Sequence, residues 1–166
     1  MKSIKLYIIS GIILVSVLGT LLHFAYALSG SNLFVGLFAP INESIWEHTK
    51  LIYFPMLIYS MFLNRKLKDN YPCISSAMIS GALLGILLII TMFYTYSGVI
   101  GYTISFIDVS IFYISVILSF YTAYKIALSC KKNKLNTVLQ SLNILIIGLF
   151  IIFTLYPPDI PLFINP

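Results

Sequence analysis

Residues 73–94 read CISSAMISGALLGILLIITMFY, a run of 22 residues that contains no Asp, Glu, Lys or Arg. An α-helix that crosses the hydrocarbon core of a bilayer needs about 20 predominantly apolar residues. This stretch therefore predicts a transmembrane helix, and it suggests that the whole chain should be read as a membrane protein.

Four further segments meet the same test. Together with the first, they predict transmembrane helices at about residues 4–28, 44–64, 73–94, 104–128 and 137–156. The segment at 44–64 is long enough only if its first turns, which carry Glu47, His48 and Lys50, are counted. We therefore expect an all-α fold, with residues 1–166 forming a single domain that is a bundle of five membrane-spanning helices.

The composition of the chain agrees with this class. Of its 166 residues, 60% are hydrophobic and only 9% are charged, whereas a soluble domain is roughly 45–50% apolar and about 25% charged. A soluble enzyme, a disordered tail and a nucleic-acid-binding module are excluded on this ground. We expect membrane lipids as partners and no nucleic acid.

The basic residues give an orientation. Because cytoplasmic loops carry an excess of Lys and Arg, we expect a cytoplasmic N-terminus, an extracytoplasmic C-terminus and a location in the plasma membrane. Cys73 and Cys130 then fall at cytoplasmic helix ends, where reduced thiols are expected. Lys50 alone falls on the outer side, and the cytoplasmic set is Lys2, Lys5, Arg65, Lys66, Lys68, Lys125, Lys131, Lys132 and Lys134.

The first predicted helix has a second interpretation. A basic start, an apolar run and the sequence Ala25-Tyr26-Ala27 are also typical of a signal peptide with its cleavage site. The apolar run at residues 6–22 is longer than the usual run of about 7–15 residues, and His23 separates it from that site. An uncleaved helix is therefore favoured.

Titratable side chains gather at the predicted outer end. Residues 42–50 read NESIWEHTK and supply Glu43, Glu47 and His48, while His23 and Asp108 come from other helices. Asp108 lies about one turn inside its helix, where an unpaired carboxylate costs up to roughly 2.5–3.5 kcal/mol on insertion scales. Such residues usually face a cavity or a partner and are functional by default.

Two chemistries fit this group of side chains. Imidazoles with carboxylates bind zinc or a similar divalent metal, and His23, His48 and Asp108 are the expected ligands. The same types of group carry out acid/base chemistry, for which Glu43, Glu47, His48 and Asp108 are the expected catalytic residues. The residues expected to contact a substrate at this end are Ser29, Asn42, Trp46, Lys50, Tyr94 and Ser97.

Several of these residues also have purely structural interpretations. Ser44-x-x-Glu47 fits a capping box at the start of a helix, and Asn42 is an alternative N-cap. Trp46 and Tyr94 fit the aromatic belt that lies at the level of the lipid headgroups. No H-E-x-x-H or G-x-S-x-G motif decides between the alternatives.

The run N-E-S-x-W-E-H-x-K at residues 42–50 resembles a signature of an uncharacterised family of small bacterial membrane proteins. The upstream L-H-F-x-Y-x-x-S-G at residues 22–30 and the ending PPDIPLFINP are similar as well. The resemblance covers most of the chain and implies a bacterial cytoplasmic membrane, but no known reaction. There is also a distant likeness to seven-helix membrane hydrolases that bind zinc through three His, an Asp and a Ser, from which this chain departs in having two His and five predicted helices.

Three functions follow as hypotheses. The first is a metal-dependent or acid/base enzyme with an outward-facing pocket, acting on a lipid-like or amphiphilic substrate at the outer leaflet. The second is a subunit that binds or transports a small polar molecule or a cation. It is favoured by the similar spacing of residues 26–30 and 94–98 and by Ser115 and Ser119 on the same helix face as Asp108. The third is an accessory protein with a structural polar network that contacts a protein partner or a second copy.

Overall fold

The computed structural model describes residues 4–129 and 135–166. Lys2, Cys130, Lys131, Lys132 and Lys134 lie outside these ranges. Within them the chain is all-helical with no strand, which confirms the predicted all-α class. The elements in chain order are α1 (Ile4–Leu28), α2 (Leu33–Gly36), α3 (Ile45–Leu67), α4 (Ile74–Ile100), α5 (Ser105–Ser129), α6 (Leu135–Leu155) and the 3-10 turn η1 (Pro161–Phe163).

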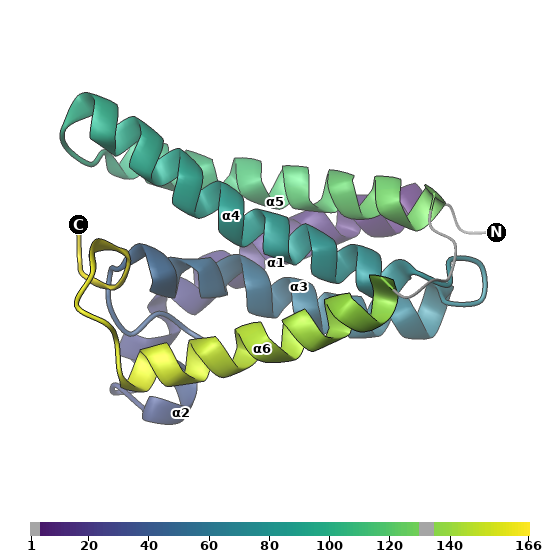
Figure 1. Ribbon diagram of the computed structural model, residues 1–166, viewed down its shortest axis with the longest axis horizontal. Coiled ribbons are helices and arrows are strands. Elements are labelled where there is room, and N and C mark those ends of the chain that lie inside the picture. The colour runs from purple at the N-terminus through teal and green to yellow at the C-terminus, as the bar shows by residue number, and fades with distance from the viewer. Residues whose placement is uncertain (1–3, 130–134) are drawn as a thin grey trace.

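The five long helices run beside one another, as Figure 1 shows. Helix α3 packs against α1 and α4, helix α5 packs against α1 and α4, and α6 lies against α4. The α3–α4 connection lies at one end of the bundle. At the other end lie residues 29–44, 101–104 and 156–166, which we call the pocket end.

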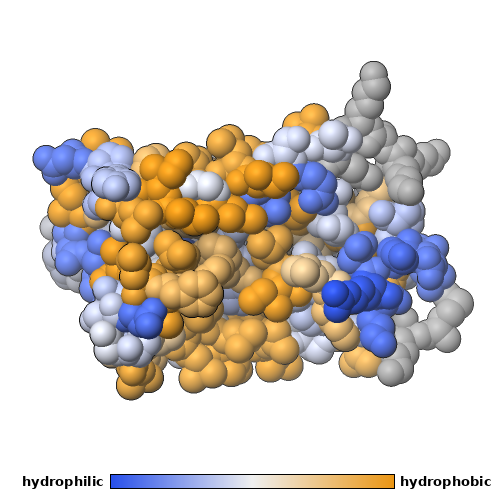
Figure 2. All heavy atoms as spheres, turned by 90° about the horizontal axis from the view of Figure 1, so that it is seen from below, coloured by the Kyte–Doolittle hydropathy of each residue, from blue (hydrophilic) through white to orange (hydrophobic). Residues whose placement is uncertain are grey.

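Four of the described helices are long and apolar enough to cross a membrane: α1, α4, α5 and residues Thr137–Leu155 of α6. Figure 2 shows hydrophobic side chains in a broad band between hydrophilic residues at the two ends of the molecule. The fifth long helix, α3, is less apolar. Buried residues occur along its whole length, from Ile45 to Leu67. Most of its side chains therefore contact other helices and not lipid, which is why α3 can be less apolar.

Polar caps set the beginning of α3. The side-chain oxygen Oδ1 of Asn42 accepts from the Ser44 amide at 2.9 Å, and the Ser44 hydroxyl accepts from the Glu47 amide at 3.4 Å. In a capping box the Glu47 carboxylate would return to the Ser44 amide. Here it accepts instead from the Ile41 amide at 3.0 Å. The Glu47 carboxylate is therefore available for contacts beyond its own helix.

Helix α1 approaches α3 closely at Gly19. A Cβ atom at Gly19 would lie 2.6 Å from the Leu51 carbonyl oxygen. That carbonyl lies four residues before Pro55, which has no N–H to donate to it. The close contact between the two helices therefore requires glycine at position 19.

The redox state of Cys73 differs from the one expected from the sequence. Cys73 is 1% exposed and is disulfide-bonded, so the prediction of a reduced thiol at this position was wrong. That prediction took the redox state from the expected compartment alone. The bond itself depends on which residues the fold brings together.

Candidate functional site

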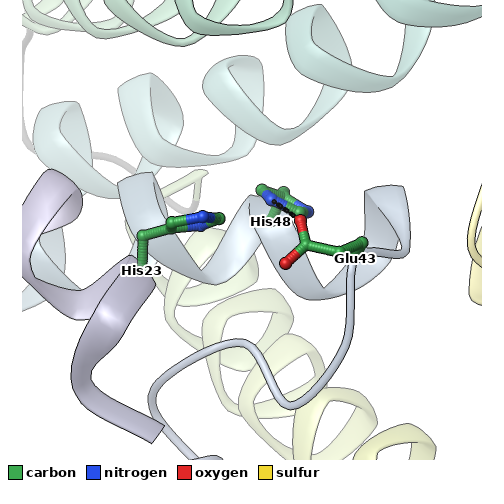
Figure 3. Close-up of side chains that lie close together, drawn as sticks. All are labelled: His23, Glu43 and His48. Carbon is green, nitrogen blue, oxygen red and sulfur yellow. Dashed lines mark ion pairs between the residues drawn. The ribbon is translucent and has the colours of Figure 1, made fainter. Parts of the chain in front are cut away.

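Two helices and a loop bring three potential metal ligands together at the pocket end. His23 comes from the last turns of α1, His48 from the first turns of α3 and Glu43 from the segment before α3 (Figure 3). One ligand atom of each lies within 4.8 Å of the other two. The imidazole centroids are 5.3 Å apart, and Nε2 of His48 lies 3.3 Å from Oε2 of Glu43. We call these three residues the His–Glu cluster; in it, Glu43 stands where the sequence predicted Asp108.

The orientation of His48 is fixed by its own helix. Its Nδ1 lies 2.9 Å from the carbonyl oxygen of Ser44. Because a carbonyl oxygen only accepts, Nδ1 carries the proton and donates it. Nε2 is then the atom that faces Glu43. Histidines that bind metals commonly donate their second ring nitrogen to a backbone carbonyl in this way.

The C-terminal segment holds the loop that carries Glu43. The amide of Glu43 donates to Oδ1 of Asn165 at 3.1 Å. Two residues earlier, the buried ring of Phe163 packs against Trp46 and Phe153, with centroids 5.3 and 4.9 Å apart. The segment after α6 therefore fixes the backbone of a cluster residue whose side chain remains 67% exposed.

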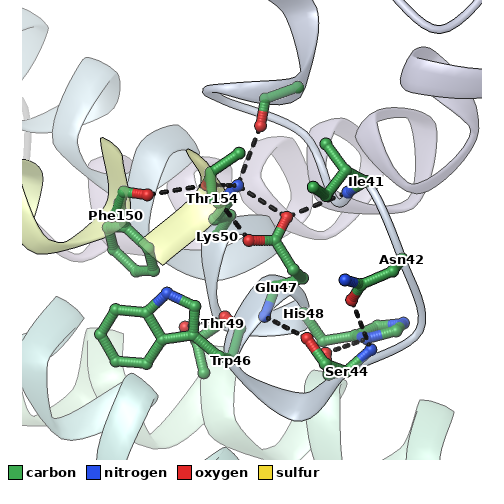
Figure 4. Close-up of polar contacts among 11 residues, drawn as sticks. Ile41, Asn42, Ser44, Trp46, Glu47, His48, Thr49, Lys50, Phe150 and Thr154 are labelled. Carbon is green, nitrogen blue, oxygen red and sulfur yellow. Dashed lines mark hydrogen bonds and ion pairs between the residues drawn. The ribbon is translucent and has the colours of Figure 1, made fainter. Parts of the chain in front are cut away.

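A separate polar network lies on α3, in which Lys50 is the central donor (Figure 4). Its Nζ donates to Oε2 of Glu47 at 2.7 Å, to the carbonyl of Gly36 at 2.9 Å and to Oγ1 of Thr154 at 2.6 Å. The Glu47 carboxylate also accepts from the Ile41 amide, and its Oε1 lies 3.2 Å from Oγ1 of Thr154. These contacts use all three ammonium protons. The side chains of Lys50 and Glu47 are 0% and 3% exposed, so the network joins α2, α3 and α6 without an open position for a ligand.

Asp108 has a different partner from either group. Its Oδ1 accepts a hydrogen bond from the hydroxyl of Tyr96, and that hydroxyl accepts from the Ile104 amide at 3.2 Å. Tyr96 lies near the end of α4 and Asp108 in the first turn of α5. The contact therefore spans the α4–α5 turn, in which Gly101 adopts φ +87°. It supplies the partner that a carboxylate at this depth requires.

One cavity of about 470 Å³ is lined both by the His–Glu cluster and by Asp108. The buried side chains in its wall are apolar and between 5% and 6% exposed: Ile45 and Leu51 of α3, Ile89 and Phe93 of α4, and Ile111 of α5. An apolar pocket with a few converging polar groups is the usual form of a small-molecule site. The sequence-predicted His23, Glu43, His48 and Asp108 therefore share one cavity, and Glu47 does not line it.

The six residues predicted to contact a substrate are not among those that line this cavity. The hydroxyls of Ser29 and Ser97 donate to backbone carbonyls three and four residues earlier, at 2.7 and 2.8 Å. Trp46 is buried among phenylalanines, and its Nε1 has no hydrogen-bond partner. The other three are exposed or occupied by the contacts described above: Tyr94, Asn42 and Lys50.

Sequence reasoning missed Thr154, Asn165 and Tyr96 as partners of the polar groups. A lone Thr in an apolar helix and an Asn in a proline-rich ending give no signal of a distant contact, and Tyr96 resembles any interfacial tyrosine. One available signal was the i, i+3 spacing of Glu47 and Lys50, which places both on one helix face.

Comparison with known proteins matches the chain to a family whose function is unknown. A family model described as a family of unknown function (DUF6512) matches residues 1–166. No curated protein and no solved structure matches the chain. The predicted resemblance to an uncharacterised family is thus confirmed, while the signature and the bacterial origin stay predictions.

Proposed function

The chain belongs to this family of unknown function over its whole length, and we propose that it is a metal-dependent membrane enzyme. In this proposal the His–Glu cluster binds one divalent metal such as zinc, and Asp108 acts as acid or base in the same cavity. The substrate is lipid-like or amphiphilic and is processed at the outer leaflet. The observation that carries the proposal is the convergence of His23, Glu43 and His48 within 4.8 Å.

The geometry of the cluster suits zinc. Zn–N and Zn–O bonds of about 2.0–2.2 Å in a tetrahedral site bring ligand atoms to roughly 3.3–3.6 Å from one another. The 3.3 Å between Nε2 of His48 and Oε2 of Glu43 already has this value, so mainly His23 has to move closer. Three protein ligands leave a fourth position open, as in catalytic rather than structural zinc sites.

The rest of the chemistry comes from the cavity. A divalent metal would polarise a carbonyl or phosphoryl oxygen and activate a water. Asp108 faces the same cavity, and its hydrogen bond from Tyr96 holds it in one position. A carboxylate held in this way can accept and return a proton during hydrolysis. The buried apolar wall formed by Leu51, Ile89 and Phe93 favours a substrate with a hydrocarbon part.

The proposal includes α3 as a fifth membrane span, with the pocket end outside the cell. The 23 residues of α3 extend over about 35 Å at about 1.5 Å per residue, enough for a hydrocarbon core of about 30 Å. Its buried charges, Glu47 and Lys50, neutralise each other, and Arg65 and Lys66 lie in its last turn. The positive-inside rule then puts Arg65, Lys66 and Lys68 in the cytoplasm.

One observation favours the alternative of a transport or binding subunit. The hydroxyls of Ser115 and Ser119 are buried without a hydrogen-bond partner. Both lie on α5, about two and three turns further from the pocket end than Asp108. Unpaired buried hydroxyls are unusual, and in a transporter they would line a polar path for the ligand through the bundle. Val116 and Phe120 are fully buried apolar side chains on the same stretch of α5, and they argue against a continuous polar path there.

Metal analysis tests the proposal. The protein is extracted from membranes in mild detergent with an affinity tag that contains no histidine, and its metal content is measured by mass spectrometry. We expect about one zinc per chain, lost in His23→Ala and in His48→Ala and kept in Asp69→Asn, which changes an exposed carboxylate just after α3, at the opposite end of the bundle. Absence of metal from the wild-type protein, together with equal lipid-hydrolysis rates for wild type and His48→Ala, would refute the proposal.

A further inference from the structure

Part of the cavity's edge lies between α1 and α5. Three of the hydrophobic side chains that line it on these helices are exposed: Phe24 is 55% exposed, Val109 54% and Tyr113 38%. Gly19 and Ile111, which also line it, are buried. The lining residues Leu51 of α3 and Ile89 of α4 are each 6% exposed. The cavity therefore has buried walls on α3 and α4 and an opening between α1 and α5, which we call the mouth. Other exposed lining residues lie at or next to the pocket end: Glu43, Thr103, Ser105 and Pro166.

The separation of these two helices explains the mouth. They are in close contact at Gly19, where a Cβ atom would lie 2.5 Å from Cζ of Phe112. One residue further, Oγ1 of Thr20 lies 3.2 Å from the hydroxyl of Tyr113. Figure 1 shows α1 and α5 together where α1 begins and apart at the pocket end. The hydrogen bond between Thr20 and Tyr113 therefore marks the inner edge of the opening.

The mouth faces lipid at the depth of the headgroup boundary. Both α1 and α5 are candidate membrane spans. His23 lies five residues before the end of α1 and Asp108 three residues after the start of α5, or roughly 8 and 5 Å from those helix ends at about 1.5 Å per residue. The 25 residues of α1 extend over about 37 Å, which exceeds a hydrocarbon core of about 30 Å. The polar groups of the cavity thus lie where lipid headgroups meet hydrocarbon.

The polar and apolar ends of the cavity are arranged in the same order as the headgroup and the chain of a lipid in the leaflet. Leu51 lies three residues further into α3 than His48, and Phe112 lies four residues further into α5 than Asp108. The polar groups are therefore nearer to the membrane surface, and the apolar walls are nearer to its centre. A lipid that enters sideways keeps the orientation it has in the leaflet.

The volume limits the size of this lipid. A cavity of about 470 Å³ lies in the lower half of the roughly 300–1,000 Å³ range of small-molecule sites. It therefore has room for a small headgroup and the first part of one hydrocarbon chain, and the rest of the chain would stay in the leaflet. We infer that the substrate is a single-chain lipid, taken from the leaflet at the pocket end through the mouth between α1 and α5. Its headgroup lies at the His–Glu cluster and its chain against Leu51 and Phe112. The inference rests on the proposed function, because the metal site is the proposed headgroup site.

Photolabelling tests the inference. The protein is reconstituted into vesicles of phosphatidylethanolamine and phosphatidylglycerol with a trace of lysophosphatidylethanolamine that carries a diazirine in its acyl chain. After irradiation, labelled peptides are mapped by mass spectrometry. We expect label on Leu51 and Ile89, which are too buried to be reached except from the cavity. Val109→Trp, which fills the mouth, should lose most of this label, and Phe24→Trp repeats the test from α1.

The control is Val99→Trp, since Val99 is 84% exposed on α4 and does not line the cavity; it should keep the label. Label confined to lipid-facing positions such as Ile13 and Ile117, with none on Leu51, would overturn the inference. So would unchanged label in both mouth variants. The metal content of the same vesicles separates the two proposals. If the protein contains metal but Leu51 is not labelled, only this inference is refuted. If Leu51 is labelled but the protein contains no metal, only the proposed metal function is refuted.

Discussion

The Nζ atom of Lys50 lies 2.7 Å from Oε2 of Glu47, and the two side chains are 0% and 3% exposed. His48, the next residue after Glu47, contacts Glu43 instead and lines the cavity. One short run of sequence thus supplies two groups with different surroundings. The buried group joins helices together, and the group at the cavity has room for a ligand, so the two give opposite expectations for stability and for metal binding.

Removal of Lys50 should destabilise the protein. Lys50→Met leaves the Glu47 carboxylate buried without its cation, and breaking a buried ion pair in this way costs about 3–5 kcal/mol. The double variant Glu47→Gln with Lys50→Met removes both charges and should be more stable than Lys50→Met alone. Thermal unfolding in detergent measures both effects, with Lys66→Met at an exposed position as control. A Lys50→Met variant as stable as the wild type would show that the network does not hold α2 and α6 to α3.

Metal binding should distinguish Glu43 from Asp108. Glu43→Gln replaces a cluster residue and should weaken zinc binding by at least the roughly 10–100-fold typical of altered metal surroundings. Asp108→Asn should leave the affinity within a few-fold of wild type, because Asp108 is bonded to Tyr96 and lies outside the cluster. Competition with a zinc chelator of known affinity gives both values. The reverse ranking would restore the ligand set His23, His48 and Asp108 that the sequence predicted.

The C-terminal segment should support the metal site from a distance. Phe163→Ala removes a buried ring from its contacts with Trp46 and Phe153, a change that costs about 3–5 kcal/mol at a buried site. It should also free the loop of Glu43, which Asn165 holds. We therefore expect lower zinc affinity as well as lower stability. Ile164→Ala, at a position 47% exposed, is the matched control and should change neither.

The sequence predicted where the long helices lie better than it predicted the residues at which they end. Hydropathy shows where a chain can contact lipid, and α1 covers the residues expected from it. Helix α4 continues to Ile100, six residues beyond the expected end at residue 94, because it ends at the left-handed residue Gly101 and not where the apolar run stops. The short elements α2 and η1 gave no periodic signal at all, because each is a single turn.

The candidate site could be predicted only by its composition. Both histidines and three carboxylates were identified from the sequence, since such groups are costly in a membrane. Their separation into the His–Glu cluster, the network of Lys50 and the pair of Asp108 with Tyr96 was not predicted, because it depends on residues from other parts of the chain. Thr154 lies 104 residues from Lys50, and Asn165 lies 122 residues from Glu43. No local pattern contains information about contacts of this range.

The close contact of α1 with α3 should make Gly19 intolerant of a side chain. In Gly19→Ala the new Cβ would meet the Leu51 carbonyl oxygen at 2.6 Å, so backbone has to shift. We expect a loss of stability of about 1–3 kcal/mol, the usual effect of overpacking. Gly148→Ala in α6 has no atom within 4 Å of the new Cβ and should gain about 0.5–1 kcal/mol. Equal unfolding temperatures for the two variants would contradict the close packing of α1 against α3.

The proposed orientation can be checked with single introduced cysteines. Ser31 and Asp69 are exposed and lie at opposite ends of the bundle. If the pocket end is outside, Ser31→Cys reacts with a membrane-impermeant maleimide in intact cells, and Asp69→Cys reacts only after permeabilisation; wild-type labelling gives the background. The disulfide at Cys73 is the observation that favours the opposite orientation, because disulfides persist in oxidising compartments. Labelling of Asp69→Cys in intact cells would reverse the orientation and move the metal site to the cytoplasmic leaflet.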